Sequence, residues 1–409
     1  MAEPEIIAAV DAGTFRIRCL VGRVDEKNEI SVIGAGSSLP AGIENGVVSD
    51  IDVLSGSIEK AINEASAMAG VDVESVFIQI AQTNFVSERS RGVHSPSRPN
   101  KPLNRLDVNR AIEVARLLSK KSNREIVQET VQDFIVDGQG LISNPVGMHA
   151  NKLEVDVYFV TGSVSNFTMT IKEAVRKTGV DVEGVVMKPL AAAEASVSHL
   201  EKKLGVLLVD LGHASTSIAA YSEGKIIGAK ILAAGAGKIT NEIAARFHLP
   251  AHIAEKVKRE KARAIAGEAR ENRNIHVQPD SNSDKIRVPE KALSEIAEKN
   301  LKEIFDLVRQ EAEKFKFPRG HTESIVLTGG GALLKDIDKY VSGRFNLPVR
   351  IGRPDGKVEG WGKLLNNPSY STAKGLLIRG SNDRQLSYIK EIGWQNPLLK
   401  IQTWIKEFF

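Results

Sequence analysis

The sequence has 409 residues, of which 42% are apolar, and its 55 basic and 51 acidic side chains give a net charge of +4. A chain of this length exceeds what one hydrophobic core usually supports, so we expect at least two lobes, and its nearly balanced charge does not favour nucleic-acid binding. The single cysteine, Cys19, excludes an internal disulfide, and no apolar run approaches the roughly 18 residues of a membrane-spanning helix. We therefore expect a cytoplasmic protein that is neither exported nor embedded in a membrane.

The first part of the chain predicts strands and one helix around a short polar turn. Apolar periodicity places strands at 5–11, 15–23 and 30–35, a helix that begins at Asp50 or Asp52 and ends near Gly70, and a strand at 75–80. The turn between the first two strands reads Asp11-Ala12-Gly13-Thr14. Its glycine permits a close backbone approach that a Cβ atom would block.

The same arrangement recurs in the second half of the chain, which indicates a duplication. Strands are predicted at 205–210, 215–222, 225–232 and 324–327, with a helix over about 290–315 and another through Leu333 and Tyr340. Asp210-Leu211-Gly212 follows a buried strand as Asp11 does, and a glycine-rich turn, Gly329-Gly330-Gly331, comes later. Two such turns facing each other could hold a polyphosphate through backbone N–H groups, with the two aspartates toward a hydrated metal ion.

Each copy carries an insertion. Residues 86–163 predict a helix over 108–118 and a strand at 153–159 whose partner is 125–136, which together form a small α+β subdomain. Residues 233–300 predict a charged helix around 251–270 and a polar loop over 272–284. A helix that starts at Lys188-Pro189 connects the two copies, since proline is tolerated in a first helical turn.

Taken in this order, these motifs resemble the actin/Hsp70/sugar-kinase ATP-binding superfamily over residues 5–380, an α/β class with an actin-like, two-lobed, duplicated fold. Within it, the chain resembles the FtsA family of bacterial cell-division proteins. The segments that carry this resemblance are Asn144 to Gly147, Ile239 to Ala244, Ala254 to Lys258, Val326 to Gly331, Tyr370 to Leu377 and the aromatic tail Trp404 to Phe409. The position of the first insertion, 86–163, also matches that family.

The resemblance implies a division of the chain into subdomains. The first lobe comprises 1–85, 164–190 and the closing helix 366–380, and its insertion is 86–163. The second lobe comprises 191–232 and 301–365, and its insertion is 233–300. A linker, 381–395, and an amphipathic helix, 396–409, follow.

The resemblance also implies a binding site for ATP with Mg²⁺. The first phosphate loop would contain Asp11, Gly13, Thr14 and Phe15, and the second would contain Asp210, Gly212, His213 and Ser215. The turn Gly329, Gly330 and Gly331 would accept the adenosine, and Glu255 and Lys258 would reach the ribose and the adenine edge. The cleft wall would be lined by Gly235, Asn241 and Glu242. Asp11 and Asp210 would hold the metal through water.

Three residues depart from the family pattern. His213 and Ala214 occupy positions that are usually glycine in the second phosphate loop, and His213 is most simply a loop residue. Lys188 stands beside the connecting proline, where proteins of this superfamily that hydrolyse ATP well commonly have an acidic or amide group that orients water. We therefore expect a nucleotide-gated switch with slow or absent turnover.

The last residues predict an amphipathic helix. At 100° per residue, one arc of 396–409 gathers Leu398, Ile401, Trp404, Ile405, Phe408 and Phe409. Aromatic side chains flanked by lysines suit the headgroup boundary of a membrane, and 14 residues are too few to span it. The FtsA family ends in such a membrane-targeting helix. An amphipathic helix that packs onto the folded body is the alternative.

By resemblance, the protein would form filaments through 86–163 and the lobe surfaces. It would receive the C-terminal peptide of the tubulin-like division protein FtsZ on 233–300, tether FtsZ to the inner face of the cytoplasmic membrane at the division site, and link it to other divisome proteins. Nucleic acid is not an expected partner. A small-molecule kinase or phosphohydrolase of the same superfamily and a pilus-assembly ATP-binding protein like PilM are the alternatives. A kinase would need a carboxylate base beside its substrate hydroxyl and would gain nothing from the aromatic tail.

Overall fold

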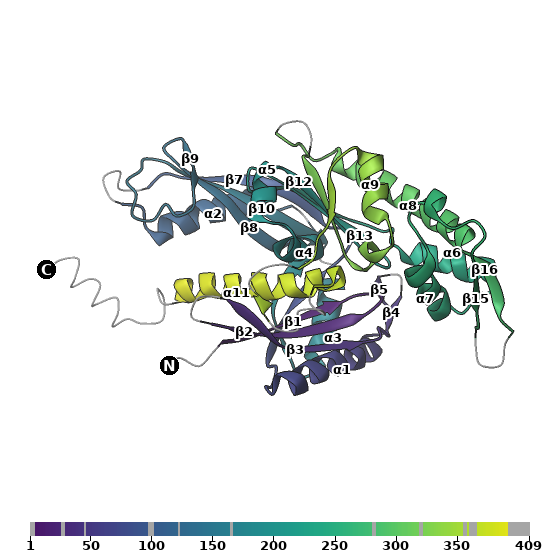
Figure 1. The fold of residues 1–409 in the computed structure, drawn as a ribbon. Helices are drawn as coiled ribbons and strands as arrows, with labels where there is room; N and C mark the ends of the chain where they lie inside the picture. Colours follow the sequence, from purple (N-terminus) through teal and green to yellow (C-terminus); the bar gives the residue numbers. More distant parts are fainter. Residues whose placement is uncertain are drawn as a thin grey trace.

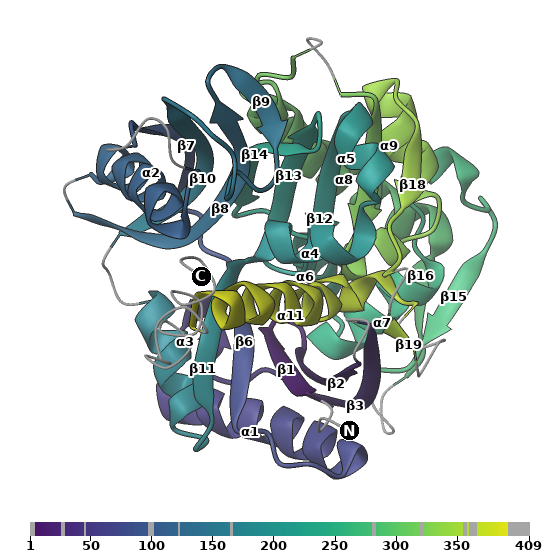
Figure 2. The same ribbon diagram turned by 90° about the vertical axis from the view of Figure 1, so that its left-hand side faces the viewer.

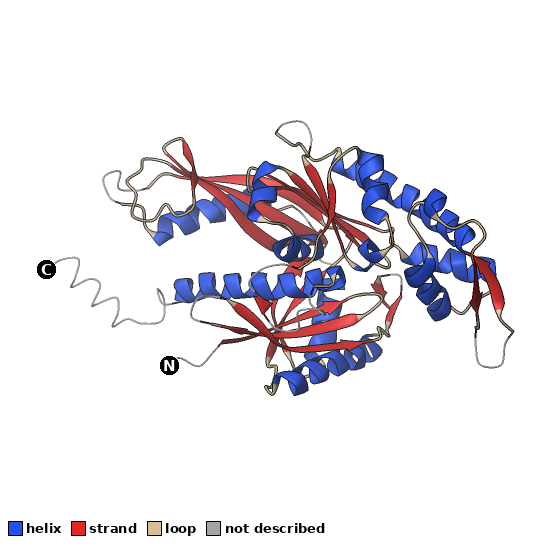
Figure 3. Ribbon diagram, in the orientation of Figure 1, coloured by secondary structure: helices blue, strands red, loops and turns tan. Residues whose placement is uncertain are grey.

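The computed structural model describes residues 5–391 except 26–28, 45, 97–101, 122, 164–166, 280–283, 319–321, 355–357 and 360–365. It contains two lobes, each built on one twisted sheet, and two smaller subdomains at the periphery (Figure 1). Helices cover the outer faces of the sheets (Figure 3). The predicted membrane-contacting residues 396–409 lie outside the described residues.

The sheet of the first lobe has the order β11-β6-β1-β2-β3-β19. Its strands are β1 Glu5–Ala12, β2 Ile17–Val24, β3 Ile30–Ser38, β6 Ser75–Ile80, β11 Asp181–Met187 and β19 Val358–Glu359. Helices α1 (Ile51–Ala69) and α3 (Phe167–Arg176) cover one face, and α11 (Ser371–Glu391) lies on the other (Figure 2). A short hairpin, β4 Ile43–Glu44 and β5 Val47–Val48, projects toward the second lobe.

Helix α1 forms with the boundaries that its sequence predicts. The Asp50 carboxylate accepts hydrogen bonds from the N–H groups of Asp52 and Val53, and Gly70 ends the helix at φ +66°. Leu54, Ile58 and the alanines at helical spacing are buried against the sheet. Asp50 rather than Asp52 is the N-cap because its backbone is extended, as a capping residue requires.

The second lobe repeats this plan. Its sheet has the order β14-β13-β12-β17-β18, formed by β12 Val206–Leu211, β13 Thr216–Ser222, β14 Lys225–Leu232, β17 Ser324–Thr328 and β18 Val349–Ile351. Its helices are α4 Lys188–Ser196, α5 His199–Leu204, α6 Gly237–Phe247, α7 Ala251–Lys261, α8 Glu290–Ala312 and α9 Ile337–Phe345, with 3₁₀ turns at Ala266–Glu268, Gly330–Leu333 and Pro368–Tyr370. In each sheet the first strand pairs with an antiparallel hairpin on one side and a parallel strand on the other.

The first insertion folds as a four-stranded sheet in the order β7-β10-β8-β9 with one helix across it. Its elements are β7 Val86–His94, α2 Arg105–Ser119, β8 Arg124–Val136, β9 Gln139–Ile142 and β10 Leu153–Ser163. The predicted pairing of the strand at 153–159 with 125–136 is confirmed. The subdomain contacts the second lobe, because Gln132 accepts the N–H of Ile226 at 2.7 Å and Asp133 pairs with Lys225 at 3.0 Å. These bonds cover the edge strand β14.

Four local predictions differ from the structure. The charged helix α7 ends at Lys261 instead of continuing to 270, and the predicted polar loop contains β15 (Asn274–Val277), which pairs with β16 (Ile286–Pro289). Helix α9 begins only at Ile337, because the glycine-rich turn first forms a 3₁₀ turn. Helix α11 runs to Glu391, into the segment predicted as a linker. Among the described residues, none of these helices is apolar enough over a sufficient length to cross a membrane.

Helices α4 and α11 cross between the two sheets and join the lobes (Figure 2). Their closest approach is at Gly375, where a Cβ atom would lie 1.7 Å from the carbonyl oxygen of Ala191. Only glycine allows this distance. The same core contains buried side chains from both lobes, including Leu208, Val326 and Leu377. The lobes are therefore packed through one continuous core beneath the cleft that separates them.

Candidate functional site: a cleft between two phosphate-type turns

The two predicted aspartates end the first strand of each sheet and lie in one cleft. Asp11 is 4% exposed and Asp210 is 2% exposed, and the cleft between the lobes has a volume of about 760 Å³. Of the residues predicted to bind nucleotide, it is lined by Asp11, Gly13, Thr14, Phe15, Asp210, Gly212, His213, Ser215, Glu255, Lys258, Gly329, Gly330 and Gly331. The structure thus brings most of the predicted residues together from four separate stretches of chain.

Each turn needs its glycine for the same reason. A Cβ atom at Gly13 would lie 2.7 Å from the carbonyl oxygen of Arg16, and one at Gly212 would lie 2.8 Å from that of Ser215. The Gly212 N–H donates to the carbonyl of Ser215 at 3.0 Å, and the Gly13 N–H donates to the carbonyl of Asp11 at 3.0 Å. The N–H groups of both glycines are used within the turns, so the glycines are required for the tight folding of each turn, and only the neighbouring N–H groups could be offered to a ligand.

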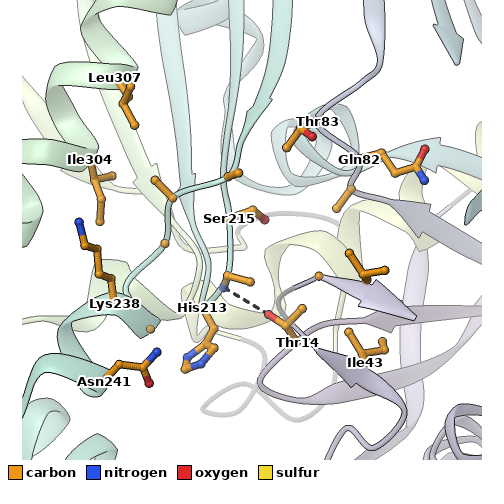
Figure 4. A pocket seen from close by; sticks show the side chains of 18 of the residues that line it. Thr14, Ile43, Gln82, Thr83, His213, Ser215, Lys238, Asn241, Ile304 and Leu307 are labelled. Carbon is orange, nitrogen blue, oxygen red and sulfur yellow. Dashed lines mark hydrogen bonds between the residues drawn. The ribbon is translucent and has the colours of Figure 1, made fainter. Parts of the chain in front are cut away.

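The two turns also touch each other across the cleft. The N–H of Ala214 donates to the hydroxyl of Thr14 at 3.3 Å, which links the lobes at the point where both turns converge (Figure 4). The rings of Phe15 and His213 pack nearby in a tilted arrangement, with centroids 5.6 Å apart and an interplanar angle of 31°. Burial, followed by the charge of Lys258, lowers the pKa of His213 below its ordinary value of 6.5, so the imidazole is neutral at pH 7. His213 therefore supplies packing at the turn and no positive charge.

Two cations compensate the buried carboxylates. Lys188 Nζ lies 3.3 Å from Asp210 Oδ2, and the Arg18 guanidinium lies 4.0 Å from Asp11 while stacking on the ring of Tyr370. Burial raises the pKa of Asp11 above its ordinary value, Lys188 and Arg18 lower it, and the nearby charge of Asp210 raises it further. Two carboxylates and two cations thus share a site with little water.

The two aspartates differ in how well they fit a magnesium ion. Asp11 Oδ1 is buried without a hydrogen-bond partner, so it offers a free acceptor to the water shell of a cation. Asp210 Oδ2 already contacts Lys188 and, at 3.4 Å, the hydroxyl of Thr372. Within the described ranges, no three His, Cys, Asp or Glu side chains gather to bind a metal directly. Asp11 therefore fits a hydrated metal ion, whereas Asp210 already has a cation beside it.

The three glycines of the third turn have different environments. Gly329 has φ +83°, and a Cβ atom there would lie 2.2 Å from Asp210 Oδ1. A Cβ atom at Gly331 would lie 2.4 Å from Leu211 Cγ, whereas nothing lies within 4 Å of one at Gly330. Gly329 and Gly331 are thus required by the fold, and Gly330 is the position that presents open backbone to the cleft.

The structure assigns different roles to Glu255 and Lys258. Lys258 is 6% exposed, and its ammonium donates to Glu255 at 2.6 Å, to the Thr240 hydroxyl at 2.9 Å and to the carbonyl of Ala236 at 3.1 Å. An ammonium has three N–H donors, so all are used within the protein. Glu255 also accepts from Thr240. Lys258 therefore positions Glu255, and Glu255 is the better candidate for contact with a ribose.

Three predicted residues lie outside this cleft. Gly235 and Asn241 line a neighbouring cavity of about 1120 Å³, which shares Thr14, His213 and Ser215 with the cleft. Figure 4 shows this cavity with Asn241 at its wall. Glu242 lines neither cavity, because its carboxylate accepts from Asn300 at 2.7 Å and from Lys299 at 2.9 Å. Those bonds hold α6 against α8, so the structure assigns Glu242 to helix packing.

Several cleft residues were not predicted as binding residues. Arg18, Tyr370, Thr372 and Lys188 line the cleft, and Gln79 donates from below to the carbonyl of Ala12 at 3.2 Å. The sequence marks Lys188 only as a departure from the family motif. The sequence offers a signal for Arg18, because it is a charged residue near the start of a mostly apolar strand, and the hairpin register pairs it directly with Asp11.

The duplicated sheets, the crossing helices and the two facing turns define an actin-like two-lobed protein. Solved structures agree on this fold. The PilM-PilN type IV pilus biogenesis complex matches with a TM-score of 0.63 at 17% identity, covering 92% of this chain and 98% of that chain. MreB 5 of Spiroplasma citri bound to AMPPNP matches with a TM-score of 0.54 at 14% identity, covering 96% and 100%.

Sequence comparison gives the family. The profile of the cell division protein FtsA matches residues 207–375, and that of the SHS2 domain inserted in FtsA matches residues 87–161. FtsA of Pseudomonas aeruginosa is 32% identical over 92% of this chain and 89% of its own length, and FtsA of Borreliella burgdorferi is 30% identical over 99% of both. The chain belongs to the FtsA family of cell-division proteins.

Substitution of Lys258 tests its role as the partner of Glu255. In the folded protein burial opposes ionisation of Glu255, but the charge of Lys258 and the hydrogen bonds from Lys258 and Thr240 outweigh it and lower its pKa below 4.5. Ionised Glu255 therefore stabilises the fold above pH 4.5, and this stabilisation is lost as the pH falls through its lowered pKa, whereas burial lowers the pKa of Lys258 below 10.5 and opposes its charged form. We expect Lys258→Met to reduce the free energy of unfolding by about 3 kcal/mol at pH 7.

This difference between Lys258→Met and the parent should shrink as the pH falls toward and below 4.5, because the isolated Glu255 protonates, and urea unfolding from pH 7 to pH 4 measures it. Lys261→Met is the control on the same helix. Lys261 is half-exposed, and its pair with Glu260 at 3.9 Å should contribute below about 0.5 kcal/mol. A difference for Lys258→Met that does not change with pH would contradict the assigned role.

Proposed function

We propose that the chain binds ATP with Mg²⁺ in the cleft between its lobes and acts as a nucleotide-gated adaptor of cell division. The observation that carries this proposal is the pair of glycine-bearing turns after Asp11 and Asp210, which are half-buried and line the same cleft from both lobes. Membership of the FtsA family supports the adaptor role. The solved MreB 5 structure bound to AMPPNP supports nucleotide binding by this fold.

In this proposal, each group of cleft residues has one task. The N–H groups of the two turns other than those of Gly13, Gly212 and Ala214, which are bonded within the protein, hold the phosphates. Asp11 holds hydrated Mg²⁺, and Gly330 and Glu255 face the adenosine. Bound Mg²⁺ would neutralise phosphate charge. Lys188 stands where a water-orienting carboxylate or amide would be needed for hydrolysis, and its ammonium cannot accept a proton from water. Turnover should therefore be slow or absent, which suits a switch more than an enzyme.

The partners follow from the family. We propose that the chain self-associates into filaments through the 86–163 subdomain and its lobe surfaces, receives the FtsZ C-terminal peptide on 233–300, and contacts other divisome proteins. It would bind lipid as a peripheral protein at the cytoplasmic face of the membrane through 396–409. One such helix binds a membrane marginally because ordering it opposes burial, whereas many helices on one filament bind firmly.

The first prediction of this proposal concerns the nucleotide site. Gly330→Glu should abolish nucleotide binding, because the new side chain would stand in the open part of the cleft, while the fold should remain, since no atom lies within 4 Å of its Cβ position. Titration with a fluorescent ATP analogue measures the first effect and thermal unfolding the second. Gly343→Glu is the control, because that glycine is also free of contacts but lies on α9 away from the cleft. Equal affinity of Gly330→Glu and the parent would place the nucleotide elsewhere.

The second prediction concerns FtsZ. Cations of α7 are poor candidates for this contact, because Lys256 and Arg259 line the interlobe cleft and Arg263, beyond the helix, pairs with Asp336 at 2.7 Å. The β15–β16 hairpin instead exposes Arg287 at the far edge of the subdomain (Figure 1). We expect Arg287→Glu to weaken binding of the FtsZ C-terminal peptide about tenfold by charge repulsion.

Fluorescence anisotropy with a labelled peptide measures this affinity. Lys60→Glu, an equally exposed charge reversal on α1 of the first lobe, is the matched control and should leave binding unchanged. If both variants bind the peptide like the parent, the hairpin is not the contact. Deleting 272–284 would be a poor test, since it removes strand β15.

The third prediction concerns the membrane. Trp404→Glu places a charge at the centre of the apolar arc of 396–409, so it should release the protein from liposomes both as a monomer and, in large part, as a filament. Thr403→Glu, which lies outside the arc, is the control and should retain most binding. Co-sedimentation with liposomes in the presence of ATP gives the bound fraction. Should Trp404→Glu pellet like the parent, the tail is part of the folded body and the adaptor proposal fails at this step.

A further inference from the structure

Lys188 lies inside the proposed phosphate site. Its side chain is 14% exposed, and its ammonium lies 3.3 Å from Asp210 Oδ2. A Cβ atom at Gly212 would come within 3.1 Å of the same ammonium, so the charge sits directly against the backbone of the second turn. This is the place at which phosphate oxygens would meet that turn.

The fold fixes the root of this side chain. Lys188 is the first residue of α4, the N–H of the preceding Met187 donates to Gln128 at 2.8 Å, and Pro189 restricts the next backbone torsion. Helix α11 packs against α4 along its length. The lysine stem therefore enters the cleft from a rigid element, and only its terminal atoms can move.

Charge in the cleft explains why this cation matters. Next to the turns are the carboxylates of Asp11 and Asp210 and the cations of Arg18 and Lys188, so the inner site is neutral before a ligand enters. Farther out, the cleft is lined by Arg16, Glu255, Lys256, Lys258, Arg259 and Glu260. Both cations pair with a carboxylate, but Arg18 lies over the ring of Tyr370 beside Asp11, whereas the ammonium of Lys188 lies against the backbone of the second turn at Gly212. A triphosphate must be neutralised there by a cation, whether tethered or free.

We propose that Lys188 is a built-in counter-ion for the nucleotide phosphates, and that it replaces part of the neutralisation that Mg²⁺ would give on the Asp210 side. This inference rests on the proposed nucleotide site. Lys188 takes phosphate charge directly while Asp11 keeps the hydrated metal, so nucleotide affinity depends only weakly on Mg²⁺. The chain can then hold nucleotide in a state that does not require the metal.

Equilibrium titration of a fluorescent ATP analogue, in Mg²⁺ and in EDTA, tests this inference. For the parent we expect less than about tenfold weaker binding in EDTA. For Lys188→Met, whose side chain has a similar length without the charge, we expect a further loss of about 10- to 100-fold in EDTA and a much smaller loss in Mg²⁺, because one charge-assisted contact is removed. Lys188→Arg should restore binding in EDTA.

The control is Lys238→Met, at an exposed lysine of the adjacent cavity that pairs with Glu303, and it should bind like the parent in both conditions. Equal dependence on Mg²⁺ in the parent and Lys188→Met would overturn the inference. If Lys188→Met does not fold, the parent alone decides, because binding that is lost in EDTA contradicts a built-in counter-ion. A parent that binds no nucleotide in either condition would instead refute the proposed nucleotide site.

Discussion

The structure depends on holding two carboxylates buried opposite each other at a boundary between two lobes. Taking an ionised carboxylate out of water costs several kcal/mol, and a second one nearby increases that cost. Arg18 and Lys188 offset it with one cation for each aspartate. The arrangement is stable only while both lobes keep their positions, so the cleft chemistry and the interlobe packing constrain each other.

The packing that meets this constraint lies below the cleft. Helices α4 and α11 cross at Gly375, and one core continues from the first sheet through these helices to the second. Lys188 begins α4 and Thr372 lies in the first turn of α11, so the helices that join the lobes also carry two of the side chains around Asp210. Any change in the angle between the lobes would therefore move the groups that we propose to contact the phosphates. This coupling gives a physical route from bound nucleotide to the shape of the protein.

Sequence reasoning predicted the duplication, the two turns and the family because each rests on local patterns. Buried strands ending at Asp11 and Asp210, with glycines at fixed positions, leave a signal within a few residues. The sequence also predicts Glu242 in the cleft and a ligand role for Lys258. Spacing on a helix indicates which residues share a face, but not which partner that face contacts. The partner of Lys258 depends on how α6 and α7 pack.

Other differences have equally specific causes. Strand β15 lies in a polar stretch whose pairing with β16 is set by the hairpin and not by apolar alternation. The docking of the 86–163 subdomain onto β14 of the other lobe depends on Gln132 and Asp133, whose partners lie about 90 residues further along the chain. Long-range polar contacts of this kind leave no periodic pattern in one sequence.

A structure of the full chain crystallised with a non-hydrolysable ATP analogue and Mg²⁺ tests the central claim most directly. The account predicts the phosphates between the Asp11 and Asp210 turns, the metal beside Asp11, and the adenosine against Gly330 and Glu255. An analogue bound in the neighbouring cavity lined by Asn241, or on an outer surface with the cleft still closed by the Thr14 to Ala214 hydrogen bond, would contradict it.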